Sequence, residues 1–572
     1  MRFPRLAAGF AVAALGLLSA APRAATAVIR MSDVAAQAGL TLLNVHGDGS
    51  GDYILDTNGN GAGFFDFDND GNLDALIVNG STRDRLARGG DRMAALYRGD
   101  GRGHFTDVTA SSGMTARGWG MGTCIADIDN DGFDDVYVTA YGPNVLYRNT
   151  GSSTGPRFKD VTQGAGVGDA RWSTGCAFGD YNRDGFVDLY VANYVSFDAR
   201  KIAKRGASST CRYVGFDVFC GPQGLTPEMN VLYRNNGDGT FTDVTEAARV
   251  RQPGAFSFGV LFSDLDDDGW PDLFVANDSV PSFLFHNNHD GTFSERGLPS
   301  GVALSGTGRA QAGMGVDAAD YNGDGRLDLI ATHFADDYHT LYEAGDRGLY
   351  SDVSYKAGLA DPPLTFMGWG TGFFDADNDG LPDLFVANGH VYPDIGRFGI
   401  STKYRQRKQL FRNLDGRRFR DVAAESGGGL AAEHSSRGAA FGDYDNDGDI
   451  DVLVVNMNEA PSLLRNDTAG GGHWITLRLI GAVTAGPEGT TNRDAIGARV
   501  RLSAGGRTQI GEVRSGGSYL SHNDFRVHFG LGDADRAARV EIRWPSGRTE
   551  TLTALAADRF YVVREGRGVQ QK

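Results

Sequence analysis

The sequence predicts an all-β protein, a seven-bladed β-propeller followed by a small C-terminal β-sandwich or barrel. An acidic loop motif occurs seven times, and a short run of β-branched and aromatic residues follows each copy. The 572 residues include 82 glycines and 17 prolines, which favours many short strands over a helical bundle. A hydrophobic content of 41% is sufficient for a large core.

The N-terminus has the pattern of a secretory signal peptide. Arg2 and Arg5 precede a weakly apolar run over residues 6–21, and small residues occupy positions 25–27. We expect cleavage after Ala27 and export to the periplasm or the extracellular space. A membrane anchor is the alternative, but Arg23 follows the run too soon for a span of about 20 residues. We therefore expect no transmembrane span in the mature chain.

The acidic motif reads Asp-x-Asp/Asn-x-Asp-Gly-x-x-Asp. Successive copies begin 53 to 84 residues apart, a repeat length typical of a propeller or solenoid. The copies begin at Asp66, Asp127, Asp180, Asp264, Asp320, Asp375 and Asp443.

Each copy has the chemistry of a calcium loop. Oxygen ligands at alternate positions suit Ca²⁺ better than zinc or copper, and glycine at position 6 permits the tight turn. We expect about seven Ca²⁺ ions, held by side chains at positions 1, 3, 5 and 9 and by the carbonyl at position 7. The candidate ligands are Asp66, Asp68, Asp70, Asn72, Asp74, Asp127, Asp129, Asp131, Phe133, Asp135, Asp180, Asn182, Asp184, Phe186, Asp188, Asp264, Asp266, Asp268, Trp270, Asp272, Asp320, Asn322, Asp324, Arg326, Asp328, Asp375, Asp377, Asp379, Leu381, Asp383, Asp443, Asp445, Asp447, Asp449 and Asp451.

Two alternatives compete with this interpretation. An EF-hand begins in the same way but needs glutamate at position 12, where this chain has apolar residues such as Ile77 and Val138. Acidic turns that bind no metal are the other alternative, and seven complete copies argue against it.

Each repeat also has a second half. Leu-Tyr-Arg-Asn occurs at residues 146–149 and 232–235, and Phe-x-Asp-Val-Thr occurs at residues 105–109, 158–162 and 241–245. One repeat therefore supplies four strands. The last repeat lacks its outer strand, and we expect residues 31–34 to supply it and close the ring.

The composition changes after residue 468. Strand-like runs cover residues 474–479, 498–502, 526–529, 540–544 and 560–563, which predicts a small antiparallel sandwich or barrel. We place the propeller at residues 28–468 and the second domain at residues 473–566.

Export makes disulfides available to the four cysteines. We expect a bridge between Cys211 and Cys220, which close a short loop. Cys124 and Cys176 lie on neighbouring inner strands, and their pairing stays open at this stage.

The repeats resemble FG-GAP or VCBS repeats, and Ser515-Gly-Gly-Ser-Tyr-Leu-Ser521 and Phe529-Gly-Leu-Gly532 are similar to the ASPIC/UnbV domain. This combination resembles the cartilage acidic protein family, especially its exported bacterial members. The resemblance implies a calcium-binding secreted propeller and no established reaction. Asn182 and Asn322 depart from the loop pattern at position 3.

Two function classes follow. The first is a non-enzymatic binding, adhesion or scaffold protein with a protein or glycan partner; the net charge of −17 argues against nucleic acid. The alternative is an enzyme or a glycan- or small-ligand-binding protein that uses the propeller face opposite the calcium loops. The candidate residues of that face are Trp119, Trp172, Asp278, His333, Trp369, His390 and Arg437.

Overall fold

The computed structural model describes residues 28–486 and 488–570, so the predicted signal peptide lies outside the described residues. Within these ranges the chain forms seven four-stranded sheets from residues 31–466 and two more from residues 473–570. None of the described helices has the length and apolar character needed to cross a bilayer. The prediction of an all-β propeller followed by a β domain is confirmed.

The strands of six sheets follow one another along the chain, from the first to the last strand of the sheet. These sheets are β2 (Ala62–Phe65), β3 (Asp74–Val78), β5 (Ala94–Gly99) and β6 (Phe105–Asp107); β8 (Gly120–Ala126), β9 (Asp135–Ala140), β10 (Val145–Asn149) and β11 (Phe158–Asp160); β12 (Ser173–Gly179), β13 (Asp188–Asn193), β16 (Val231–Asn235) and β17 (Phe241–Asp243); β18 (Ser257–Ser263), β19 (Asp272–Asn277), β20 (Phe283–Asn287) and β21 (Phe293–Glu295); β22 (Val316–Ala319), β23 (Asp328–Ala331), β24 (Thr340–Ala344) and β25 (Tyr350–Asp352); and β26 (Gly368–Phe374), β27 (Asp383–Asn388), β28 (Gln409–Asn413) and β29 (Phe419–Asp421).

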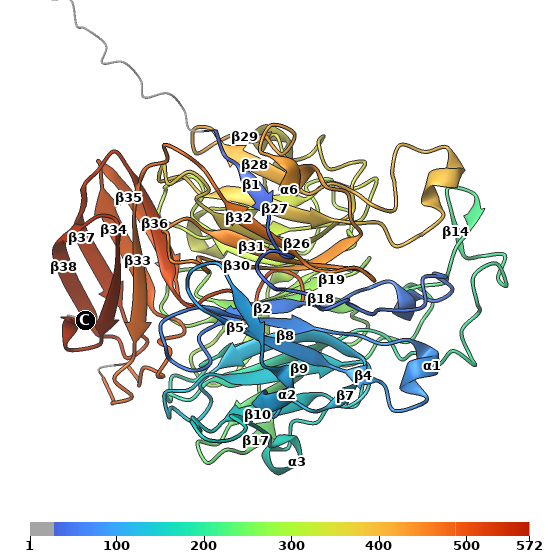
Figure 1. Cartoon of the computed structure of the whole chain (residues 1–572), viewed down its shortest axis with the longest axis horizontal. Coiled ribbons are helices and arrows are strands. Elements are labelled where there is room, and N and C mark those ends of the chain that lie inside the picture. Colours follow the sequence, from blue (N-terminus) through green and yellow to red (C-terminus); the bar gives the residue numbers. More distant parts are fainter. Residues whose placement is uncertain (1–27, 487, 571–572) are drawn as a thin grey trace, which may run out of the picture.

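The seventh sheet joins the two ends of the propeller sequence. It contains β30 (Ser436–Gly442), β31 (Asp451–Asn456) and β32 (Ser462–Asn466), and its fourth strand is β1 (Met31–Asp33). Met31 pairs with Asn466 and Asp33 with Leu464 in an antiparallel register. The predicted closing strand is therefore present, and Figure 1 shows β1 beside β32.

The first strands of the seven sheets form a closed ring. They contact one another in the order β2, β8, β12, β18, β22, β26 and β30, and β30 contacts β2 again. Because each first strand is almost entirely buried, its apolar residues pack between two neighbouring sheets. The acidic loop of each sheet connects its first and second strands.

Short ribbons and helices lie in the connections between the propeller strands. Two β-ribbons pair β4 (Asp91–Arg92) with β7 (Arg117–Gly118) and β14 (Arg212–Tyr213) with β15 (Phe216–Asp217). The helices are α1 (Arg83–Leu86), α2 (Thr109–Ser112), α3 (Thr162–Ala165), α4 (Gly297–Ser300), α5 (Ser354–Ala357) and α6 (Gly428–Ala431), with 3₁₀ turns η1 (Ile54–Asp56), η2 (Asp346–Gly348) and η3 (Ile395–Phe398).

The C-terminal strands form two four-stranded sheets beside the ring, red in Figure 1. The first contains β36 (Val527–Gly532), β33 (His473–Ile480), β39 (Arg559–Arg564) and β40 (Gly568–Gln570), and the second contains β35 (Arg507–Glu512), β34 (Arg499–Ala504), β37 (Arg536–Arg543) and β38 (Thr549–Ala556). The expectation of a purely antiparallel domain was wrong, because β33 pairs parallel with β39. Alternation of apolar residues predicts strands but not their direction, and β35, β38 and β40 were not predicted.

Candidate metal centres and the central channel

The first carboxylate of each acidic loop closes the turn. In the loop after β2, Asp66 accepts hydrogen bonds from the backbone N–H groups of Asp70 and Gly71 at 3.0 and 2.8 Å. The bond from the position-6 glycine recurs in all seven loops. Each of these glycines has a positive φ, as at Gly71 (89°), which is why the sequence requires glycine there.

The last carboxylate of each loop ties the turn to the third strand of its sheet. Asp74 accepts from the N–H groups of Phe67 and Gly99 at 2.9 and 2.8 Å. The bond to the end of the third strand also occurs in all seven sheets. In six of the seven loops the position-9 aspartate also accepts from the position-2 N–H group and so fixes both sides of the loop; in the fifth loop that oxygen of Asp328 has no partner among the described residues.

Within the loops, other carboxylate oxygens lie close together and have too few hydrogen-bond donors around them. The carboxylates of Asp66, Asp68 and Asp70 each offer an oxygen within 4.8 Å of the others, and three further loops contain similar groups. Six loops each bury one carboxylate oxygen that has no hydrogen-bond partner. These oxygens belong to Asp68, Asp129, Asp264, Asp328, Asp377 and Asp445. Because buried polar atoms are nearly always paired, a hard cation fits this donor set.

Burial also raises the pKa values of several carboxyl groups in the acidic loops. The pKa of Asp74 rises to about 9 and that of Asp127 to about 8, mainly through desolvation, with neighbouring carboxylates adding to the effect. The pKa values of Asp272 and Asp443 rise to about 7, again mainly through desolvation. A divalent cation would supply the charge that stabilises the ionised forms.

Cations from the third strands neutralise part of this charge. Arg98 lies 2.9 Å from Asp68 and 3.1 Å from Asp70, and Arg148 pairs with Asp129. Arg148 belongs to the recurrent Leu-Tyr-Arg-Asn motif and Arg98 to the similar Leu96-Tyr-Arg-Gly99, and neither motif was predicted to have a role at the loops. His286 has the same place in the fourth sheet, 3.2 Å from Asp266.

The asparagine of the same motif joins neighbouring sheets. Asn149 donates its side-chain N–H to the carbonyl of Phe67 in the preceding acidic loop at 2.8 Å, and Asn235 donates to Ile128 at 2.8 Å. Asn287, Asn413 and Asn466 make the equivalent contact. Its repetition in the sequence was the signal that could have revealed this role.

The two loops with asparagine at position 3 keep an oxygen in place. The side-chain carbonyls of Asn182 and Asn322 accept from the N–H groups of Asp184 and Asp324 at 3.1 and 2.9 Å. The third loop is also the one loop among the described residues with no unpartnered buried carboxylate oxygen. It is therefore the weakest candidate for a metal.

The residues of the opposite face lie inside the molecule. Trp119, Trp172 and Trp369 are at most 2% exposed and belong to one apolar cluster at the centre of the ring. His333 and His390 are at most 3% exposed, and burial lowers their pKa values to about 4 and about 3. These side chains lie around the centre of the ring, but they are buried and not accessible to solvent.

Arg437 and Asp278 are the other two predicted residues of the opposite face. Arg437 is fully buried, donates hydrogen bonds to the carbonyls of Thr57 and Ser436, and lies 4.2 Å from the centre of the Trp369 ring. Asp278 is half-buried and accepts a hydrogen bond from Tyr194 at 2.6 Å.

A segment of the C-terminal domain fills the channel from the side of the acidic loops. This plug segment, residues 514–524, pairs with first strands of the ring: Leu520 accepts from Thr123 N–H at 3.1 Å, and Ser518 exchanges hydrogen bonds with Val316. A Cβ at Gly61 would lie 1.6 Å from the carbonyl oxygen of Leu520, so this close approach requires glycine. No pattern in the sequence predicts this insertion.

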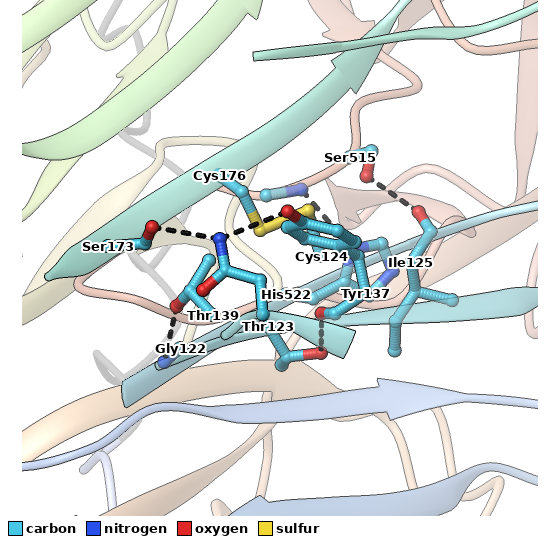
Figure 2. The surroundings of a disulfide bond; sticks show 12 residues. Gly122, Thr123, Cys124, Ile125, Tyr137, Thr139, Ser173, Cys176, Ser515 and His522 are labelled. Carbon is cyan, nitrogen blue, oxygen red and sulfur yellow. Dashed lines mark hydrogen bonds between the residues drawn. A yellow bond between two sulfur atoms is a disulfide. The ribbon is translucent and has the colours of Figure 1, made fainter. Parts of the chain in front are cut away.

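The tip of the plug segment reaches the apolar cluster. Tyr519 is fully buried, its hydroxyl donates to the carbonyl of Asn58 at 3.0 Å, and its ring packs edge-on against Trp369. Figure 2 shows Ser515 and His522 of the same segment beside Cys124 and Cys176. The Ser515 hydroxyl donates to the carbonyl of Ile125 at 2.6 Å.

Both disulfides are formed. Cys211 and Cys220 are bridged as predicted, and Cys124 and Cys176 are bridged between β8 and β12 (Figure 2). The second bridge covalently joins two neighbouring sheets of the ring. The one-residue offset of the two cysteines relative to their loops does not keep them apart, since their Cα atoms lie 5.7 Å apart.

A long insertion covers the other end of the channel. The insertion segment, residues 196–228, connects β13 to β16 and carries the Cys211–Cys220 bridge. Phe219 packs on Tyr392 with ring centres 5.0 Å apart, and Arg205 pairs with Asp394 at 3.1 Å. The channel is thus closed by the plug segment at one end and by the insertion segment at the other.

Comparison with known families agrees with this architecture. Residues 66–138, 127–191, 216–275, 264–331 and 375–454 match the FG-GAP-like repeat, and residues 488–570 match the ASPIC and UnbV domain. The fold and its loops therefore define a repeat propeller with an appended β domain. The chain belongs to the family of FG-GAP-like repeat proteins that carry a C-terminal ASPIC and UnbV domain.

The chain is similar to cartilage acidic protein 1. It is 26% identical to the mouse protein over 456 residues, which cover 76% of this chain and 62% of the mouse protein. Identity to the human protein is also 26%, over 76% of this chain and 61% of that protein. The chain thus spans less than two thirds of the length of these relatives.

Two solved structures are similar to this chain at low sequence identity. BBS1N in complex with ARL6DN has a TM-score of 0.40 and 10% identity, over 78% of this chain and 99% of that one. A lectin from Agrocybe aegerita that recognises non-reducing terminal N-acetylglucosamine has a TM-score of 0.37 and 15% identity, over 67% and 89%.

Proposed function

We propose that this chain is an exported calcium-binding propeller that acts as a non-enzymatic binding, adhesion or scaffold protein. The observation that carries the calcium assignment is the set of six buried carboxylate oxygens without partners, one in each of six acidic loops. Aspartate oxygens at positions 1, 3, 5 and 9 would hold the ion together with the position-7 carbonyl. Bound calcium would act as an electrostatic cross-link within each loop.

The closed channel supports a non-enzymatic role. Trp369, His390 and Arg437 are buried beneath the insertion segment and against the plug segment, so a substrate would have to displace packed side chains to reach them. The two disulfides support export, because such bridges persist in oxidising compartments. Replacement of Arg437 distinguishes this role from the alternative, a ligand site on the opposite face.

Metal analysis of the purified chain tests the calcium assignment. We expect about seven Ca²⁺ ions per chain and a melting temperature that falls by many degrees after calcium removal, because the ions bind the folded loops alone. Asp377→Asn should lower the content by about one ion. Asp100→Asn is the matched control, since Asp100 is an exposed turn residue outside the acidic loops. Fewer than about three ions in the native chain would contradict the assignment.

A further inference from the structure

The fourth sheet has a histidine where other sheets have an arginine. In the first, second and sixth sheets, the third strand carries an arginine that pairs with the aspartate at position 3 of the acidic loop, as Arg98 does with Asp68 at 2.9 Å. In the fourth sheet, the third strand β20 has His286 at this place. Asp266, the position-3 aspartate of that loop, therefore faces an imidazole nitrogen instead of a permanent positive charge.

One nitrogen of His286 lies between two carboxylates. Its Nδ1 atom is 3.2 Å from Oδ2 of Asp266 and 3.2 Å from Oδ1 of Asp272. This nitrogen carries at most one proton, so it donates a well-directed hydrogen bond to only one of the two oxygens. With metal–ligand bonds of about 2.0–2.1 Å and tetrahedral angles, the ligand atoms around Zn²⁺ lie about 3.3 Å apart. Both distances fit such a centre better than a charge-assisted hydrogen bond of about 2.7–2.9 Å.

A small cavity borders these three side chains. It has a volume of about 20 Å³, and its lining includes Asp266, Asp272, His286, Arg296 and Arg347. This volume is sufficient for one water molecule, which would complete a four-coordinate centre with three protein ligands. Neither arginine forms an ion pair with Asp266 or Asp272 in the described part of the chain. The position of the metal is therefore not taken by a guanidinium group.

The same loop buries an oxygen that lacks a partner. Asp264, at position 1, is 4% exposed, and its Oδ1 atom has no hydrogen-bond partner among the residues that the structure describes. Asp264, Asp266 and Asp268 each offer an oxygen within 4.8 Å of the others. Nε2 of His289 lies 2.7 Å from Oδ2 of Asp268, which is an ordinary hydrogen-bond distance. The fourth loop thus combines oxygen donors, which suit calcium, with the imidazole of His286, which suits zinc.

We propose that the fourth sheet binds one Zn²⁺ ion, or a chemically similar transition-metal ion, through Nδ1 of His286, Oδ2 of Asp266 and Oδ1 of Asp272. A water molecule in the cavity would be the fourth ligand. The site shares two carboxylates with the fourth calcium loop, and in that respect it rests on the function proposed above. The ion would supply at this place the positive charge that Arg98 supplies in the first sheet.

Calorimetric titration of the calcium-saturated chain with zinc chloride tests the site, on protein purified without a polyhistidine tag. We expect one strong zinc site that excess calcium does not block, because imidazole is a poor ligand for calcium. His286→Arg should weaken zinc binding more than about 100-fold, since losing a ligand costs more than losing an outer-shell partner. The substitution introduces the residue found in other sheets, so the melting temperature without zinc should equal that of the wild type.

The matched control is His289→Gln. It removes the neighbouring histidine, which contacts Asp268 and is not one of the three proposed ligands. Glutamine can keep an N–H donor for Asp268, and zinc affinity should stay within about threefold of the wild type. Co²⁺ in place of Zn²⁺ gives an independent readout. A four-coordinate Co²⁺ centre absorbs strongly in the visible region, and this absorption should be absent from His286→Arg.

Several results would overturn the proposal. Zinc affinity that is unchanged by His286→Arg, or reduced more by His289→Gln, would exclude His286 as the ligand. Complete displacement of zinc by an equal concentration of calcium would make this an ordinary calcium loop. If His286→Arg melts below the wild type, His286→Gln, which removes the imidazole without adding charge, decides the outcome.

Calcium content measured on the same samples separates the two proposals. A chain that holds calcium but has no zinc site would overturn this inference and leave the proposed calcium binding intact. A chain with the zinc site but without calcium would have the opposite meaning.

Discussion

At the scale of single residues, Arg437 decides between the two function classes. Its guanidinium lies between Trp369 and backbone carbonyls of two distant segments, including Thr57, and has no exposed surface. A fully buried guanidinium group can have one of two roles. It either stabilises the fold through its hydrogen bonds, or it binds a ligand after the insertion segment has moved away. The hydrogen bonds to carbonyls favour the first interpretation, because they already use the donors that a ligand would need.

We therefore expect Arg437→Ala to lower the free energy of unfolding by about 2–4 kcal/mol, since it leaves carbonyls unpaired and opens a cavity. Thermal and urea unfolding measure this effect. Arg397→Ala is the control on the same side of the ring, where the side chain is 81% exposed and the cost should stay below about 0.5 kcal/mol. An unchanged unfolding curve together with loss of binding to a glycan array would instead support the ligand face.

At the scale of elements, β1 closes the ring. It covers the edge of β32, and Met31 is fully buried in the core of the seventh sheet. Without β1, the backbone groups of residues 464–466 would lose their partners and form an exposed edge.

We expect a chain that begins at residue 35 to melt at a lower temperature and to aggregate, because it exposes this edge and removes a buried side chain. Light scattering during size-exclusion chromatography measures the association. Val28→Ser serves as the control, since Val28 is 68% exposed. A truncated chain that stays monomeric and equally stable would contradict the closing role of β1.

The sequence predicts this closure, the acidic loops and most propeller strands because each depends on local pattern. Glycine at position 6 or a β-branched run specifies its own conformation. The plug segment has no such pattern. Its glycines and serines resemble an ordinary loop, and its partners, such as Val316 and Thr123, lie about 200 to 400 residues away along the chain. The pairing of Cys124 with Cys176 likewise depends on how two sheets meet.

At the scale of the whole molecule, the C-terminal domain rests on the acidic loops. Arg499 donates to the backbone of the fourth loop at Asp264, Arg526 donates to the carbonyl of Asp443 at 2.6 Å, and the backbone of Arg493 donates to Asn130 at 2.7 Å. The geometry of the loops thus positions the second domain. We therefore expect the proposed calcium binding to affect the stability of both domains.

We expect the calcium-free chain to lose stability as the pH rises. Burial raises the folded-state pKa of Asp66 to about 6, of Asp443 to about 7 and of Asp74 to about 9, above the value of about 3.9 for unfolded aspartate. The folded state then binds more protons than the unfolded state. The resulting stability is fully present below about pH 4 and is lost as the pH rises through these folded-state values.

Calcium should change the sign of this dependence, because metal binding requires ionised carboxylates and releases protons. Calorimetric melting at about pH 5 and pH 8 measures the pH dependence of stability in both states, with calcium removed beforehand and with calcium added in excess. The stabilisation by calcium should be larger at the higher pH. A calcium-free chain that becomes more stable between these two pH values would contradict the role of the loop carboxylates.

The position of the plug segment has a consequence for biosynthesis. The first sheet of the ring is complete by residue 107, yet the seventh needs residues 462–466 to meet the N-terminal strand, and the axis is filled only by residues 514–524. A chain emerging in order from its N-terminus must therefore hold partly assembled blades, with apolar edges uncovered, until residues 462–466 and 514–524 arrive. A truncation that removes residues 514–524 therefore leaves the axis of the ring unfilled and does not yield a shorter version of the same molecule.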